Sequence, residues 1–157
     1  MDKDLKLDKL IEACGYGLLE PAKRLVEDGV NVNGYQNNLT PLIASIYGQN
    51  IELTEFLIKS GALINQGMHT VMHEAFDCIL ENMIAENLEK PDIDEFKIIE
   101  FLINEGGDVD KRNEVGESPL EAISRYASDN KSFERLKRIF RPIIPDIDKR
   151  IQFKKKQ

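Results

Sequence analysis

Several residue types that mark other classes of protein are scarce or absent in this chain. Its 157 residues include no tryptophan, only two histidines and only two cysteines. Cys14 and Cys78 each stand alone within an apolar stretch, so neither a disulfide framework nor a cysteine-rich zinc site is expected. We expect both thiols to stay reduced, which favours a cytoplasmic location.

Long hydrophobic runs are missing as well. No stretch approaches the roughly 20 apolar residues that a membrane span needs, and the start of the chain, with Asp2 and Asp4, lacks the apolar segment of a signal peptide. We therefore expect a cytoplasmic protein with no membrane partner, and secretion as an effector stays an alternative. Hydrophobic residues still make up 41% of the chain, which is enough for one folded domain over residues 1–157.

Motifs that carry chemistry are also lacking. His69 and His73 are one turn apart and Asp77 follows one turn later, a spacing that can place metal ligands on one helical face. His69, however, precedes the expected helix start. A catalytic pair of Cys78 with His73 is not expected either, because Cys78 lies five residues after His73, on another side of the helix. No glycine-rich phosphate loop follows a strand. The sequence predicts no catalytic residue, no metal site and no cofactor, and therefore no enzyme.

A net positive charge is found only at one end of the chain. Residues 131–157 carry ten lysines or arginines against three acidic residues, a net charge of +7, whereas the whole chain carries −7. Residues 1–130 therefore carry −14. An acidic body repels phosphate groups, so we expect no nucleic-acid partner. We interpret the basic end as a solvated last helix followed by a frayed basic tail over residues 147–157.

What the chain does contain is an internal repeat. Three apolar helix patterns each end in a glycine, namely Gly29, Gly61 and Gly106. A glycine just past a helix adopts the left-handed conformation that lets the last carbonyls find donors. Helix starts recur too, because Thr40-Pro41 and Ser118-Pro119 place a hydroxyl at the N-cap and proline at the first helical position. Alternating starts and stops of one design indicate one repeated unit.

These features resemble the ankyrin-repeat family, whose unit of about 33 residues carries a T-P-L-H-x-A motif and pairs two helices with a hairpin-like turn. Residues 40–65 match that pattern nearly throughout, and residues 70–75 supply the motif histidine, His73. The resemblance implies an all-α solenoid of stacked antiparallel helix pairs with short hairpin turns, roughly eight helices in all. It divides the chain into repeats at about 5–34, 35–67, 68–112 and 113–146.

The third repeat departs from the pattern by an insertion near residues 78–94. Apolar residues recur every three or four positions up to Leu88, which predicts that the first helix of this repeat runs to about Leu88. Pro91 should end it. The extension either packs on repeat four or presents Met83, Ile84 and Leu88 as an apolar surface for a partner.

In the ankyrin family, partners lie against the concave face formed by the turn tips and the ends of the first helices. Those positions in this chain are Tyr16, Tyr35, Tyr47, Met68, Arg112, Arg125 and Tyr126. All four tyrosines fall on this surface, and tyrosine and arginine are frequent binding hot spots, although the aromatic rings could instead pack internally.

The resemblance thus implies a protein-interaction module that binds a partner protein as a monomer. A partner with positive charge would complement the acidic body. A generic adaptor is one interpretation. The alternative is a dedicated inhibitor, for example an immunity-type protein that neutralises a toxin, or a secreted effector that captures a host protein.

Overall fold

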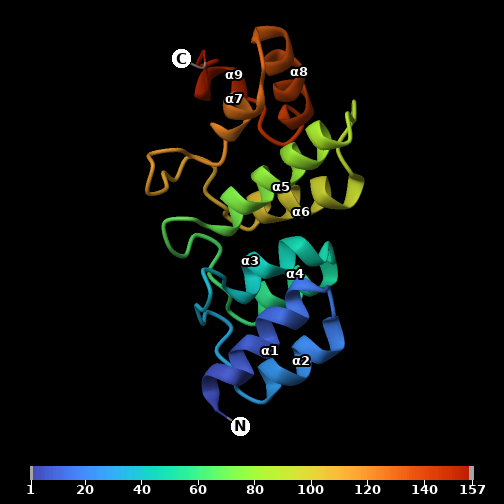
Figure 1. Ribbon diagram of the computed structural model, residues 1–157, viewed down its shortest axis with the longest axis vertical. Coiled ribbons are helices and arrows are strands. Elements are labelled where there is room, and N and C mark those ends of the chain that lie inside the picture. Colours follow the sequence, from blue (N-terminus) through green and yellow to red (C-terminus); the bar gives the residue numbers. More distant parts are fainter. Residues whose placement is uncertain (1, 156–157) are drawn as a thin grey trace.

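The computed structural model of the protein describes residues 2–155. Within that range the chain forms nine helices, and these are stacked in chain order along the long axis, with the two termini at opposite ends (Figure 1). The helices are α1 (Lys3–Gly15), α2 (Leu19–Glu27), α3 (Pro41–Gly48), α4 (Ile51–Lys59), α5 (Val71–Ala85), α6 (Ile93–Asn104), α7 (Ala122–Tyr126), α8 (Asn130–Phe140) and α9 (Ile147–Arg150).

The helix pairs confirm the expected all-α solenoid. Neighbouring pairs contact each other through their first helices, as α1 with α3, α3 with α5 and α5 with α7, and second helices also meet in α2 with α4 and α4 with α6. Buried apolar residues from all of the pairs form one continuous core. Among the helices of residues 2–155, none is long and apolar enough to cross a membrane.

The expected N-caps start the helices of the inner repeats. The Thr40 hydroxyl accepts a hydrogen bond from the Ile43 amide at 3.1 Å, with Pro41 at the first helical position. The Thr70 hydroxyl caps α5 in the same way by accepting from the Met72 amide. Such a cap stabilises a helix by about 1 kcal/mol, because it satisfies a backbone donor that has no partner within the helix.

Asparagine side chains join consecutive repeats at the ends of the second helices. The Asn33 amide donates to the Gly61 carbonyl at 2.9 Å, and Asn65 donates in the same way to the Gly106 carbonyl at 3.0 Å. The next position in this series is Asp110, whose carboxylate pairs with Arg150 of α9 at 2.7 Å. Asp110 therefore pairs with α9, whereas Asn33 and Asn65 each bind a glycine carbonyl of the next repeat.

The extended first helix of repeat three ends at Ala85, three residues before Leu88, where the sequence placed its end. Its added turns are buried on one side, since Ile79 and Leu80 have no exposed surface. Earlier in the same helix, the Phe76 ring stacks on Phe140 of α8 with centroids 4.9 Å apart. The insertion therefore supplies core to the junction between repeats three and four.

The expectation of a frayed tail over residues 147–157 is wrong for the part that is described, residues 147–155. Ile147 and Ile151 are buried, and the Phe153 ring lies 5.6 Å from the Phe133 ring. The Lys154 amide donates to the Ser124 hydroxyl at 2.8 Å. These contacts hold residues 147–155 against α7 and α8 at this end of the stack. Residues 156 and 157 lie outside the described residues.

Candidate protein-binding groove

A hollow on the surface lies between the turn tips and the first helices. It is a groove of about 530 Å³, and its lining includes Tyr35, Ile43, Met68, His69, Glu114 and Val115. The three turns that bound it project from the same side of the stack, on the left in Figure 1. The groove is therefore lined by residues of repeats two, three and four, and we call their turns around Tyr35, Met68 and Val115 the first, second and third tip.

Each tip holds an apolar side chain out towards solvent. Tyr35 is 64% exposed, Met68 is 49% exposed and Val115 is 85% exposed. The first tip is a tight turn in which Asn37 and Asn38 both have positive φ, the conformation of the two-residue hairpin loop. Its shape is fixed locally, and the exposed side chains are therefore held in place before any partner arrives.

A carboxylate on α5 joins the groove to the preceding repeat. Glu74 accepts a hydrogen bond from the Tyr47 hydroxyl, and its other oxygen lies 2.8 Å from Nε2 of His69. The His69 contact lowers the pKa of Glu74, and the carboxylate raises the pKa of His69 in return. The half-buried Cys78 thiol lies 3.6 Å from Glu74, and burial raises its pKa to about 12, so the thiol stays protonated.

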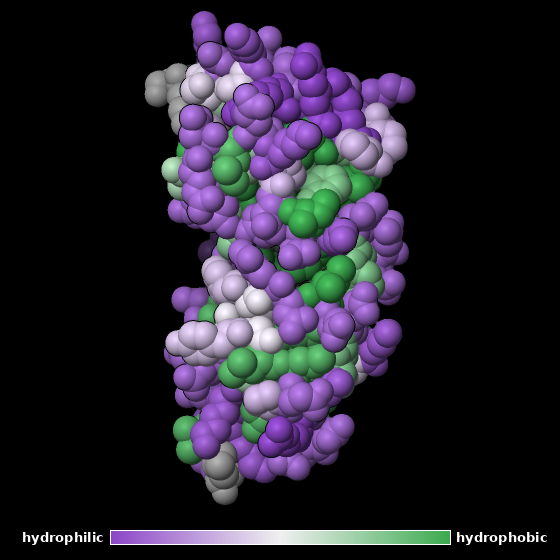
Figure 2. Space-filling view, turned by 90° about the vertical axis from the view of Figure 1, so that its right-hand side faces the viewer, coloured by the Kyte–Doolittle hydropathy of each residue, from purple (hydrophilic) through white to green (hydrophobic). Residues whose placement is uncertain are grey.

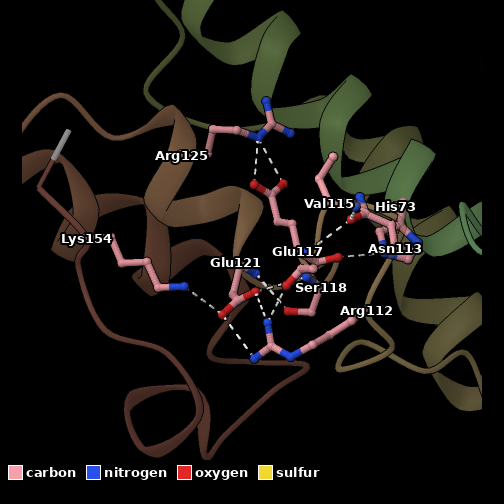
Figure 3. Close-up of polar contacts among 10 residues, drawn as sticks. His73, Arg112, Asn113, Val115, Glu117, Ser118, Glu121, Arg125 and Lys154 are labelled. Carbon is pink, nitrogen blue, oxygen red and sulfur yellow. Dashed lines mark hydrogen bonds and ion pairs between the residues drawn. The ribbon is translucent and has the colours of Figure 1, made fainter. Parts of the chain in front are cut away.

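The third tip is held by a second set of polar contacts (Figure 3). Arg125 of α7 donates to both carboxylate oxygens of Glu117, at 2.9 and 3.1 Å, and its other side meets Asp77 of α5. His73 places Nε2 at 3.2 Å from the Glu117 carbonyl oxygen. This contact provides a partner for a carbonyl of the third tip.

Most of the predicted tyrosines are exposed. Tyr16 is 73% exposed at the end of α1, and Tyr47 is 51% exposed at the end of α3. Tyr126 is half-buried, packs on the core and carries the Arg125 guanidinium over its ring at 4.6 Å. Only Tyr35 lines the groove itself. That the four act as one binding stripe stays a prediction.

The two predicted arginines are held by partners within the chain. Arg112 contacts both carboxylate oxygens of Glu121, at 2.8 and 3.3 Å, and Arg125 is paired as described above. Both lie beside the third tip in Figure 3. Neither guanidinium group is part of the groove lining, and each is paired with a carboxylate of the chain.

The prediction that Met83 lies on the surface is wrong. The sequence left open that Met83 and Ile84 both form an apolar surface, yet Met83 is only 2% exposed whereas Ile84 is 44% exposed. Successive side chains on a helix point in directions about 100° apart. When Met83 faces the core, Ile84 therefore points away from it. Met83 is therefore a core residue, and Ile84 remains as a surface residue at the end of α5.

Sequence reasoning missed Val115 as a surface residue, although it is the most exposed of the large apolar residues described. It lies at the tip because the Asn113 side chain accepts hydrogen bonds from the amides of Val115 and Glu117, at 3.1 and 3.0 Å. The signal that could have identified it is an apolar β-branched residue directly before Gly116, at a turn where polar residues are usual.

Comparison with known proteins gives the following similarities. No protein-family model matches the chain. The Caenorhabditis elegans BRCA1-associated RING domain protein 1 is 25% identical over 151 residues, which cover 92% of this chain and 19% of that protein. An ankyrin repeat and KH domain-containing protein of Caenorhabditis briggsae is 28% identical over 124 residues, or 76% of this chain and 4% of that protein.

A Fowlpox virus (strain NVSL) protein that is named for its ankyrin repeats is 26% identical over 135 residues. These residues cover 84% of this chain and 36% of the viral protein. The chain therefore spans between 4% and 36% of the length of the three proteins.

Proposed function

From the similarity of this chain to ankyrin-repeat proteins in sequence and in fold, we propose that it is a protein-interaction module that binds a partner through the groove and catalyses no reaction. The observation that carries the proposal is the row of exposed apolar side chains, Tyr35, Met68 and Val115, along one groove. Large apolar residues exposed together on a folded protein mark an interaction site.

The charges beside the groove support a role for these apolar contacts in affinity. Glu74, Glu117 and Asp77 each already have a histidine or arginine partner. A partner that covers these groups has little isolated charge to desolvate, so burial of apolar surface can dominate the binding free energy. Tyr35 and Met68 are the proposed anchors, because each offers a large contact area.

The partner is a protein with positive charge in this proposal. Residues 1–130 carry a net charge of −14, which accelerates the approach of a basic partner and repels an acidic one. The adaptor and inhibitor alternatives use the same groove and differ in what the partner does. If the partner loses an activity when it is bound, the chain is an inhibitor, and if it keeps the activity, the chain is an adaptor.

Site-specific photo-crosslinking tests the proposal. A photoreactive amino acid replaces Met68 in one variant and Leu63 in the other. Leu63 is 61% exposed but lies outside the groove. Both variants are expressed in the organism that makes the protein, and crosslinked proteins are identified by mass spectrometry. We expect a partner that crosslinks from position 68 and not from position 63.

The captured partner is then measured against variants of the groove. Changing Tyr35 and Met68 together to alanine should weaken its affinity by about tenfold or more, the loss expected for a binding hot spot. Equal crosslinking from both positions, or unchanged affinity of the double variant with an intact fold, would contradict the proposal.

A further inference from the structure

A second apolar surface lies on the edge of the molecule away from the tips, where α5 ends and α6 begins. It consists of Ile84, Leu88, Ile93 and Phe96, and we refer to it as the ledge. Ile84 is 44% exposed and Ile93 is 62% exposed, while Leu88 and Phe96 are half-buried against the core. Figure 1 shows the α5–α6 connection on the side opposite the three tips.

The apolar character of this edge is visible in the space-filling view. Figure 2 looks onto the right-hand side of Figure 1 and shows apolar patches set among hydrophilic residues. The ledge differs from the groove in origin, because it is built by the insertion that lengthens repeat three. The regular repeat pattern does not require it.

The ledge is held in one shape by hydrogen bonds across the insertion. The Leu88 amide donates to the Met83 carbonyl at 2.8 Å, and the Asn87 amide donates to the Ile84 carbonyl at 3.2 Å. The buried Glu95 carboxylate accepts from Asn82 of α5 and, at 3.1 Å, from Gln49 of the preceding repeat. These contacts fix the end of α5 beside the start of α6, so Ile84 and Ile93 are displayed on a preorganised surface.

The segment that forms the ledge is rich in negative charge, and one cation from α8 reaches it, since Arg135 donates to the Leu88 carbonyl at 3.4 Å. Residues 81–97 carry six acidic and two basic residues, a net charge of −4. Within residues 2–155, no ion pair involves Glu81, Glu86 or Glu89, or the two basic residues of this segment, Lys90 and Lys97. Glu74, Asp77 and Glu117 beside the groove, in contrast, each have a histidine or arginine partner inside the chain. Unpaired acidic side chains next to exposed isoleucines suit a ligand that brings both positive charge and apolar surface.

We propose that the ledge is a second binding surface, separate from the groove, and that it binds a basic amphipathic helical segment of a partner protein. Apolar residues of that segment pack on Ile84 and Ile93, and its lysines or arginines meet the acidic rim. An amphipathic helix fits because its residues at every third or fourth position form one apolar stripe with charged flanks. Anionic lipid surfaces and nucleic acids are disfavoured, since the same acidic rim repels them.

A peptide titration followed by NMR tests this proposal without knowledge of the natural partner. The ¹⁵N-labelled full chain is titrated with a synthetic peptide of about four helical turns, with leucines on one face and lysines on the other. We expect chemical-shift changes that centre on residues 82–97 and an affinity that falls steeply as salt rises.

The matched variants are Ile84→Asp with Ile93→Asp on the ledge, and Val115→Asp at the third tip. All three side chains are exposed, so the variants are expected to fold, and circular dichroism checks this. The double ledge variant should bind the peptide about tenfold more weakly or worse, because it loses both apolar contacts. Val115→Asp should leave the affinity unchanged.

Three outcomes would overturn the proposal. In the first, the shift changes centre on the groove. In the second, the folded double ledge variant binds as tightly as the original chain. In the third, a peptide with glutamate in place of lysine binds equally well. None of these outcomes bears on the partner that is captured at the groove, so failure of this proposal is distinguishable from failure of the proposed function.

Discussion

Repeats two and three begin alike and then diverge. Their first helices both start at a threonine cap, Thr40 or Thr70, but α3 has 8 residues and α5 has 15. In repeat two, Gly48 ends the helix, and Gln49 adopts a left-handed conformation with φ of 48°. In repeat three, Cys78 takes the place of Gly48 and apolar residues continue the helix.

The comparison teaches that a close contact between repeats sets the length of the first helix. A Cβ atom on Gly48 would lie 2.4 Å from the Cys14 carbonyl oxygen and 2.6 Å from the Gly17 nitrogen. Repeat two must therefore keep glycine at this position, which is the last residue of α3. Repeat three has lost that constraint, and its extra turns contribute core on one side and the ledge on the other.

The assignment of one side of the α5 extension to the core and the other to the ledge is tested most sharply by two neighbouring substitutions in α5. Met83→Ala should lower the free energy of unfolding by about 3 kcal/mol, because it leaves a cavity in the core. Ile84→Ala should change it by less than about 0.5 kcal/mol, because the side chain is on the surface. Chemical denaturation of both variants measures the difference. Similar losses in the two would show that the inner and outer sides of the extension are misassigned.

The explanation for the short α3 of repeat two can be tested by a substitution of Gly48. Gly48→Ala should cost about 2 kcal/mol of stability, since the new methyl group meets backbone atoms of repeat one that cannot move aside easily. The matched change Cys78→Ala in repeat three should cost less, because it removes atoms from a half-buried position and creates no clash. Thermal unfolding compares the two variants. A tolerated Gly48→Ala would remove our explanation for the short α3.

The ends of the second helices, in contrast, should respond alike in both repeats. Gly61 and Gly106 have φ of 97° and 95°, and a Cβ atom at either position would meet nothing within 4 Å. Gly61→Val and Gly106→Val should each destabilise the fold by about 1 kcal/mol, the cost of a left-handed conformation for a residue with a side chain. Urea unfolding of the two variants should give matching losses, and a large difference would contradict a shared stop signal.

The smallest effect is expected from the contact of His69 with Glu74, the carboxylate that also accepts from Tyr47 of repeat two. The raised pKa of His69 means that its contribution to stability is fully present below the ordinary histidine pKa and is lost as pH rises through the raised value. The lowered pKa of Glu74 means that its contribution is lost as pH falls through the lowered value. The pair therefore stabilises the fold most between these two pKa values.

His69 is 43% exposed, so the gain should stay below about 1 kcal/mol. His69→Gln should flatten the dependence of unfolding free energy on pH around the ordinary histidine pKa of about 6.5. Unfolding curves on both sides of that pH measure the slope. An unchanged slope in the variant would show that another group titrates there.

Much of the fold could be predicted from the sequence because its signals are local. Thr40 and Gly61 act within one turn of the helix that they start or end, so their pattern alone gives the helix pairs. The packing of residues 147–155 was not predictable in this way. Their lysines and arginines indicate a solvated tail. The spacing of Ile147, Ile151 and Phe153 is too irregular to predict that they pack at the end of the stack.

The candidate site was predictable only in part, for a related reason. The repeat register placed Tyr35 and Met68 on the tips, but it carried no information on ion pairs between distant residues. Arg125 is 48 residues from Asp77 in sequence, and the local pattern around either residue does not indicate that they pair. The same limit applies to Met83 and Ile84. A small rotation of the helix would expose Met83 and bury Ile84, and the repeat register does not fix that rotation.

The most direct test of the central claim, that the groove is the binding surface, is a comparison of two dissociation constants. The protein captured at position 68 is titrated into Met68→Asp and Leu63→Asp, two exposed apolar positions that differ in whether they line the groove. We expect Met68→Asp to weaken binding about tenfold or more and Leu63→Asp to leave it unchanged. Equal affinities for the two folded variants would contradict the claim.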